Sequence, residues 1–166
     1  MPAALDTPVP PASLLGRLAA ERRAFADAYT LRLPQRVSLA EFVEAFYTTR
    51  WFKLERWLIA RAGRPSTDAD VRALAQGADV RMAMWTVQAR TPTELLMHED
   101  SGVTRSWFQV EAGEGVTTLW FGSAFMPKHA GGPGGPRRFS WGFHALLGFH
   151  RAYSRALLRA AARRLG

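Results

Sequence analysis

The sequence predicts an α+β protein in which a curved antiparallel sheet wraps around a long C-terminal helix. Three observations lead to this fold class. Residues 79–126 alternate between apolar and polar side chains in runs separated by short turns, which is typical of neighbouring antiparallel strands. A connector rich in glycine and proline follows over 127–136. From about Phe139 to Leu165, apolar side chains then recur at helical spacing.

The chain of 166 residues fits a single domain with a sizeable core. Four prolines among small residues in 1–11 predict a flexible arm. Ser13 is a suitable cap for a short helix over 14–23. We therefore divide the chain into residues 1–24, an arm with a short helix, and residues 25–166, one domain.

The first half of that domain is predicted to be one strand followed by three helices. Side chains alternate over residues 25–33, which indicates a strand that begins the sheet. Ser38 and Glu41 have the spacing of a capping box and therefore mark a helix start. Apolar residues over 51–62 recur at steps of three and four, and Thr67 or Ser66 then caps a third helix.

Four runs with a period of two make up the rest of the predicted sheet, over 80–90, 94–99, 103–111 and 116–126. Trp107 and Trp120 lie on the more polar face and are placed to pair across neighbouring strands. The other face should be turned to the core, and it collects Ala83, Trp85, Val87, Leu95, Met97, Phe108, Val110, Leu119, Phe121 and Phe125.

The last helix has an apolar stripe with one polar ring near its centre, His150, beside Phe143, Leu147 and Tyr153. Histidine titrates near neutral pH, so His150 is placed to bond a ligand carbonyl or to act as a base. The alternative interpretation is a core histidine paired with a backbone carbonyl or a tyrosine hydroxyl. The same two interpretations apply to Tyr153.

The net charge of +8 is concentrated at the C-terminal end of the chain. Residues 137–166 hold seven arginines and no acid, and Arg151, Arg155, Arg159 and Arg163 lie opposite the apolar stripe. This face either binds an anionic membrane surface or nucleic-acid phosphates, or is a solvated face that complements the helix dipole. No motif for reading bases accompanies it.

Several kinds of chemistry are excluded or unsupported by the residues present. The chain has no cysteine, which excludes thiolate nucleophiles, disulfides and sulfur-ligated zinc and fits a reducing compartment. No metal-ligand spacing, nucleophile elbow or phosphate loop occurs, so we expect no metal and no cofactor. No apolar run approaches the roughly 18 residues of a membrane span, and residues 1–11 lack signal-peptide features, so we expect a cytoplasmic protein.

Three segments carry a family resemblance: 93–100 (TELLMHED), 116–121 (VTTLWF) and 149–160 (FHRAYSRALLRA). Together with the order of elements over roughly 25–165, they resemble the helix-grip superfamily of START lipid-transfer domains, pollen-allergen-like proteins and polyketide cyclases. Within it, the chain looks like a bacterial family of unknown function. The full pattern of that superfamily has about seven strands, whereas five are predicted here.

The resemblance implies a cavity between sheet and terminal helix that takes a hydrophobic small molecule or lipid. In this chain the alternative is that aromatic side chains fill the space. Three hypotheses follow: a noncatalytic binder, a cyclase- or hydrolase-type enzyme that uses His150 and Tyr153, and a peripheral adaptor that works through its arginine face. The sequence predicts no oligomeric state. The candidate ligand-binding residues are Trp85, Met97, Phe108, Phe121, Phe125, Phe143, Leu147, His150 and Tyr153.

Overall fold

The computed structural model describes residues 3–61, 63–126 and 141–166, apart from the side chains of residues 55, 58, 59 and 141–147. In this part of the chain a seven-stranded antiparallel sheet has the order β1-β2-β7-β6-β5-β4-β3. The elements are β1 (Leu5–Asp6), α1 (Leu14–Arg22), β2 (Phe25–Leu33), α2 (Leu39–Tyr47), α3 (Arg50–Arg61), α4 (Asp68–Gln76), β3 (Arg81–Met82), β4 (Trp85–Arg90), β5 (Glu94–Glu99), β6 (Thr104–Ala112), β7 (Thr117–Phe125) and α5 (Trp141–Leu165).

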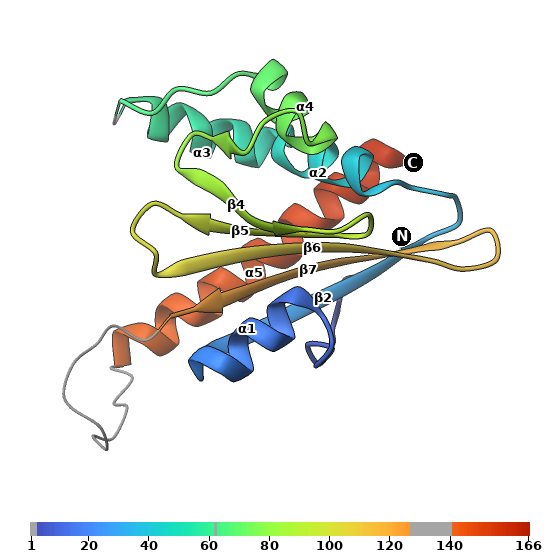
Figure 1. Cartoon of the computed structure of the whole chain (residues 1–166), viewed down its shortest axis with the longest axis horizontal. Helices are drawn as coiled ribbons and strands as arrows, with labels where there is room; N and C mark the ends of the chain where they lie inside the picture. Colours follow the sequence, from blue (N-terminus) through green and yellow to red (C-terminus); the bar gives the residue numbers. More distant parts are fainter. Residues whose placement is uncertain (1–2, 62, 127–140) are drawn as a thin grey trace.

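The sheet is curved and unclosed, and it is covered by helices on both faces (Figure 1). The long helix α5 packs along the inner face, and α1 lies on the opposite, outer face. Helices α2, α3 and α4 gather beside the β3–β4 edge, where α2 packs against α5. The predicted fold class, a curved antiparallel sheet with a long C-terminal helix, is therefore confirmed.

Short strands at both edges of the sheet raise the number of strands above the five predicted. The run over 80–90 is not one strand, because it folds back as a tight hairpin in which Met82 pairs with Trp85. Ala83 lies in that turn with a φ of 53°, so its predicted place on the core face of a strand is wrong. At the other edge, β1 pairs with Thr30 and Tyr29, within the segment expected to be a flexible arm. Such short edge strands leave few backbone groups free for pairing with another chain.

The inner face holds the main core, which is centred on aromatic side chains. Phe108 is fully buried. The centroid of its ring lies 4.9 Å from that of Phe46, 5.2 Å from that of Phe121 and 5.5 Å from that of Phe42. Phe42 and Phe46 come from α2, whose start has the predicted capping box of Ser38 with Glu41. This helix therefore presents its aromatic residues to the sheet.

A second, smaller core lies on the outer face, under α1. Trp107 is fully buried there and pairs with Trp120 across neighbouring strands at 6.1 Å, as the sequence predicts. Its indole Nε1 and the backbone N–H of Leu14 both donate to Glu94 Oε2 at 2.8 Å. The Glu94 carboxylate therefore gives the buried indole N–H a hydrogen-bond acceptor and links the first turn of α1 to β5.

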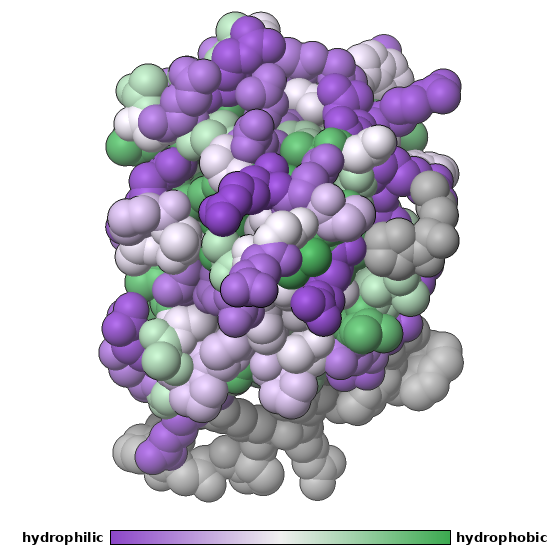
Figure 2. Space-filling view, turned by 90° about the vertical axis from the view of Figure 1, so that its right-hand side faces the viewer, coloured by the Kyte–Doolittle hydropathy of each residue, from purple (hydrophilic) through white to green (hydrophobic). Residues whose placement is uncertain are grey.

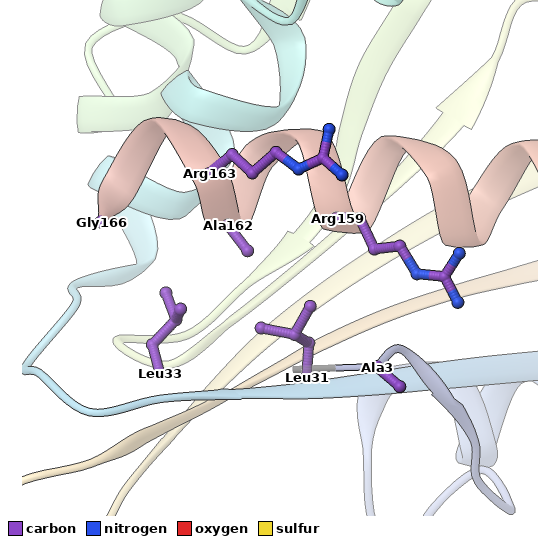
Figure 3. Close-up of a pocket in the computed structure, with 7 residues that line it drawn as sticks. All are labelled: Ala3, Leu31, Leu33, Arg159, Ala162, Arg163 and Gly166. Carbon is purple, nitrogen blue, oxygen red and sulfur yellow. The ribbon is translucent and has the colours of Figure 1, made fainter. Parts of the chain in front are cut away.

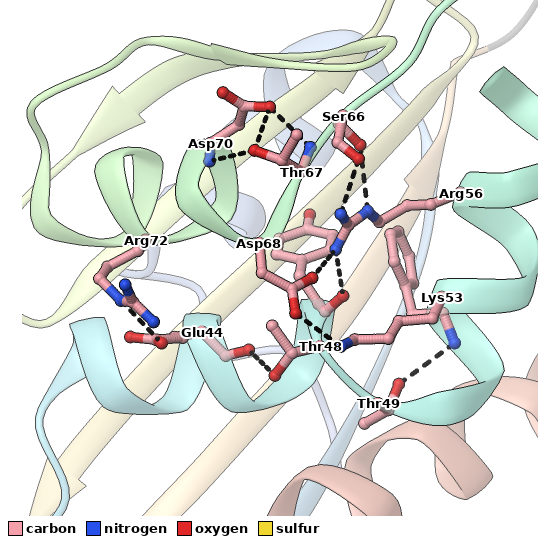
Figure 4. A network of polar contacts seen from close by, with 12 residues as sticks. Glu44, Thr48, Thr49, Lys53, Arg56, Ser66, Thr67, Asp68, Asp70 and Arg72 are labelled. Carbon is pink, nitrogen blue, oxygen red and sulfur yellow. Dashed lines mark hydrogen bonds and ion pairs between the residues drawn. The ribbon is translucent and has the colours of Figure 1, made fainter.

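A polar network fixes α3 to the start of α4 (Figure 4). The buried Arg56 donates to the Ser66 carbonyl at 2.7 Å, to the Ser66 hydroxyl at 3.0 Å and to Asp68 Oδ1 at 2.8 Å. Lys53 forms a second ion pair with Asp68, and this hydrogen bond is the main reason that the pKa of Asp68 lies below its usual range. The network determines which side of α3 is turned inward.

Candidate functional site

A cavity of about 270 Å³ lies between the inner face of the sheet, α5 and the helices α2 and α3. It occupies the place where the sequence predicts a ligand site. Its lining comprises Phe46, Tyr47, Phe52, Trp85, Thr104, Ser106, Phe121, Ser123, Phe125, Phe149, His150, Tyr153, Ser154 and Leu157.

The larger part of this lining is aromatic. Phe46 and Tyr47 come from α2 and Phe52 from α3, and all three are buried. Phe46 and Phe121 pack with ring centroids 4.5 Å apart, and Phe52 lies edge-on to Tyr47 at 4.6 Å. Fixed aromatic walls of this kind favour an apolar guest.

Apart from Leu157, the remaining part is a cluster of hydroxyl groups and one imidazole. Ser106 and Ser123 face each other across β6 and β7, and both are buried. Neither hydroxyl has a hydrogen bond to another described residue, and neither is a fully enclosed polar atom, so both open into the cavity. Thr104 is the inward-facing residue of β6 that precedes Ser106. Helix α5 contributes His150 and Ser154 to the same cluster. Buried hydroxyls are normally paired, so this cluster is placed to bond a guest or water.

His150 contacts the hydroxyl cluster, and the charge of the buried Asp27 acts on it. Its Nε2 lies 3.4 Å from the Ser154 hydroxyl, and its ring is edge-on to Phe125 at 5.0 Å. Burial lowers the pKa of His150, while the negative charge of Asp27 opposes that shift. The imidazole is therefore neutral at pH 7 and retains one nitrogen that can accept a proton.

Asp27 lies on β2 directly opposite Ser123, beside the cavity lining. Its Oδ2 accepts a hydrogen bond from the Tyr29 hydroxyl at 2.9 Å, whereas its Oδ1 is buried and has no partner among the described residues. Burial raises the pKa of Asp27 above its usual range, and the hydrogen bond from Tyr29 only partly offsets this. Burial also raises the pKa of the Tyr29 hydroxyl, with the Asp27 charge as the next cause.

The structure brings together five of the nine predicted ligand-binding residues: Trp85, Phe121, Phe125, His150 and Tyr153 all line the cavity. Met97 and Phe108 lie beneath it as fully buried core residues, and the Tyr47 hydroxyl contacts the Met97 sulfur at 3.4 Å. The predicted residues Phe143 and Leu147 lie outside the described side chains.

Sequence reasoning missed the serine cluster and the position of Asp27 beside it. The signal was present for Asp27, an acid at an inward position among the apolar residues of β2. Serine carries no comparable signal, because small polar residues are common on either face of a strand. Only the register of β2, β7 and β6 places Asp27, Ser123 and Ser106 in one row.

Of the α5 arginines predicted to bind anions, some already contact other residues of the protein. Arg155 forms an ion pair with Asp6 and lies 5.5 Å from the Tyr29 ring. Arg159 and Arg163 border a second cavity of about 410 Å³, into which Leu31 points from β2 (Figure 3). The end of the molecule that carries the C-terminus is mainly hydrophilic, with hydrophobic residues in small separate areas (Figure 2). Anion binding by these arginines stays a prediction.

Comparisons with known proteins do not indicate a function for this site. No family model, curated protein or solved structure matches the chain. Membership of the helix-grip superfamily therefore stays a prediction, carried by the order of elements and the three segments. Within the described ranges, no three side chains of His, Asp or Glu gather as metal ligands would. In the same part of the chain, no helix has the length and apolar character needed to cross a membrane.

Proposed function

We propose that the cavity under α5 binds a small, largely apolar molecule that carries one hydrogen-bonding group. The observation that carries this proposal is the pair Ser106 and Ser123, two buried residues whose hydroxyls open into one side of a mainly aromatic cavity without a hydrogen bond to another described residue. Aromatic walls supply affinity through burial of apolar area, and a few placed polar groups supply orientation. Hydroxyls that have no partner in the protein are available to the polar group of such a guest.

The size of the cavity limits the guest. Its volume of about 270 Å³ is just below the usual range for ligand sites, roughly 300 to 1,000 Å³. A compact ring system or a short acyl chain fits this volume better than a whole phospholipid. The polar group of the guest is expected beside Ser106, Ser123 and His150, with its apolar part toward Phe46 and Phe52.

Replacing Ser123 with leucine should fill the polar side of the cavity and weaken binding. We expect N-phenyl-1-naphthylamine, a neutral apolar probe, to bind the native protein and to bind Ser123→Leu at least about tenfold more weakly. Fluorescence titration measures both affinities. Thr118→Leu is the matched control, because it lies on the outer face of the same strand and should leave the affinity unchanged.

The smaller change Ser106→Val guards against misfolding of the leucine variant. It should also weaken probe binding, and thermal unfolding shows whether each variant is folded. Native-like affinity in folded Ser123→Leu and Ser106→Val would refute the proposed site. Equal weakening in Thr118→Leu would mean that the probe reports a general loss of packing.

A second candidate function is catalysis on the same guest, with His150 as general base. The observation that favours it is an imidazole in the cavity wall, 3.4 Å from the Ser154 hydroxyl, whose pKa is lowered by burial while the Asp27 charge opposes that shift and would stabilise the imidazolium formed when His150 takes a proton. Asp27 then has the positioning role, and Tyr153, the partner suggested by the sequence, is one wall of the cavity. A His150→Gln protein that binds its guest but no longer converts it would favour catalysis over binding alone.

A further inference from the structure

Helix α3 exposes a row of large apolar side chains. Trp51 is 61% exposed, and Leu54 and Trp57 are each 53% exposed. They recur every three residues along the helix, which places the two indoles about 9 Å apart along its axis. Tryptophan and leucine rarely gather on the solvent side of a helix without a partner.

The orientation of α3 is fixed by contacts on its opposite side. Phe52 is 4% exposed and packs against Phe46 and Tyr47. Arg56, one turn further along, is 8% exposed and bonded to Ser66 and Asp68 (Figure 4). At about 100° per residue, the exposed row lies on the side opposite Phe52 and Arg56. The helix therefore cannot bury this row without giving up its ion pairs.

Positive charge flanks the row at both ends of the helix. Arg50 and Arg61 are exposed, and neither has an ion pair among the described residues. The guanidinium of Arg61 lies 4.5 Å from the Trp57 ring. Lys53 is already paired with Asp68, as is Arg56. Apolar side chains between two exposed arginines match a surface that carries negative charge on the outside and apolar chains beneath it.

We propose that the exposed face of α3, comprising Trp51, Leu54 and Trp57 with Arg50 and Arg61, docks onto an anionic lipid bilayer. The apolar side chains would enter the boundary between headgroups and acyl chains, as in interfacial amphipathic helices, and the arginines would contact lipid phosphates. A second copy of the chain is disfavoured as occupant, because each copy carries +8.

Docking through this face would bring the cavity close to the bilayer. Phe52, on the inward side of the same helix, is part of the cavity wall. An apolar guest could then pass from lipid to protein over a short path. The docking itself requires no guest, so it stands or falls separately from the function proposed for the cavity.

Vesicle flotation of the full chain tests the proposal. At low salt we expect binding to vesicles of phosphatidylcholine mixed with phosphatidylglycerol, and weak binding to phosphatidylcholine alone. The double variant Trp51→Gln with Trp57→Gln should lose at least about tenfold in affinity. Glutamine forms helices well, and both sites are more than half exposed, so the variant should fold.

Leu5→Ser is the matched control, since Leu5 is as exposed as Trp51 but lies on β1 at the far edge of the sheet. Its vesicle affinity should equal that of the native protein. The proposal is overturned if native protein does not float with anionic vesicles, or if the double tryptophan variant floats equally well. Tryptophan-dependent self-association, or tryptophan-dependent binding of single-stranded DNA without vesicle binding, would also overturn it.

Discussion

Replacing Gly122 with alanine should lower the free energy of unfolding by about 3 kcal/mol, the upper end of typical costs of overpacking. A Cβ at this position would lie 2.7 Å from Leu15 Cδ2, 2.8 Å from the Asp27 carbonyl oxygen and 2.9 Å from Trp107 Cε3. The carbonyl belongs to β2, and the indole is fully buried, so neither can move cheaply. Urea unfolding measures the loss.

Gly148 provides the control for this substitution. It lies in α5, where an added Cβ would meet nothing within 4 Å. Gly148→Ala should therefore raise stability, by up to about 1 kcal/mol, through helix propensity alone. If Gly122→Ala were as stable as native protein, α1 would not pack on Trp107 and Gly122 as described, and the account of the outer core would be wrong.

Asp27→Asn should raise the free energy of unfolding by about 2 kcal/mol at pH 8, because it removes a buried charge while an amide oxygen can still accept from Tyr29. Such a gain would be expected of a group retained for function, since sites that serve function often reduce stability. Denaturant unfolding of both proteins across the pH range measures the difference.

The pH dependence of that difference has a defined sign. The folded-state pKa of Asp27 is raised, so its contribution to stability is fully present below the unfolded pKa, near 3.8, and is lost as pH rises through the folded pKa. The advantage of Asp27→Asn over native protein should therefore be small at pH 3 and increase toward neutral pH. An advantage that shrinks as pH rises would contradict the raised pKa.

The same variant tests the link between Asp27 and His150. The Asp27 charge raises the pKa of His150 against the effect of burial, so Asp27→Asn should lower the pKa of this imidazole further. Histidine titration by NMR measures it, with the half-buried His98 on β5 as internal reference. An unchanged titration of His150 would remove the electrostatic basis for His150 as a general base.

The fold was predictable because its main elements are encoded locally. Alternation over residues 25–33 and 94–126 and the capping box at Ser38 identify strands and a helix start from neighbouring residues alone. The aromatic walls of the cavity follow from the same alternation, since Trp85, Phe121 and Phe125 share the inward face. The alternation of apolar residues and the helix cap thus predict both the layers of the fold and the apolar half of the cavity.

The other half of the site depends on contacts that no local pattern encodes. Ser123 meets Asp27 and Ser106 only through strand register. Phe108 and Phe121 have the same periodicity and both pack against Phe46 of α2, yet only Phe121 lines the cavity, because Phe42 also covers Phe108. The turn at Ala83 escaped prediction because alanine there adopts a backbone conformation that this residue seldom takes.

Native mass spectrometry of freshly purified protein, compared with its denatured mass, shows whether the cavity under α5 binds a ligand. We expect a copurified small molecule on the native protein, or uptake of one N-phenyl-1-naphthylamine per chain, and loss of either in Ser123→Leu. A bare native mass in repeated preparations, together with no uptake of the probe, would contradict a ligand-binding cavity and indicate that this space is part of an ordinary core.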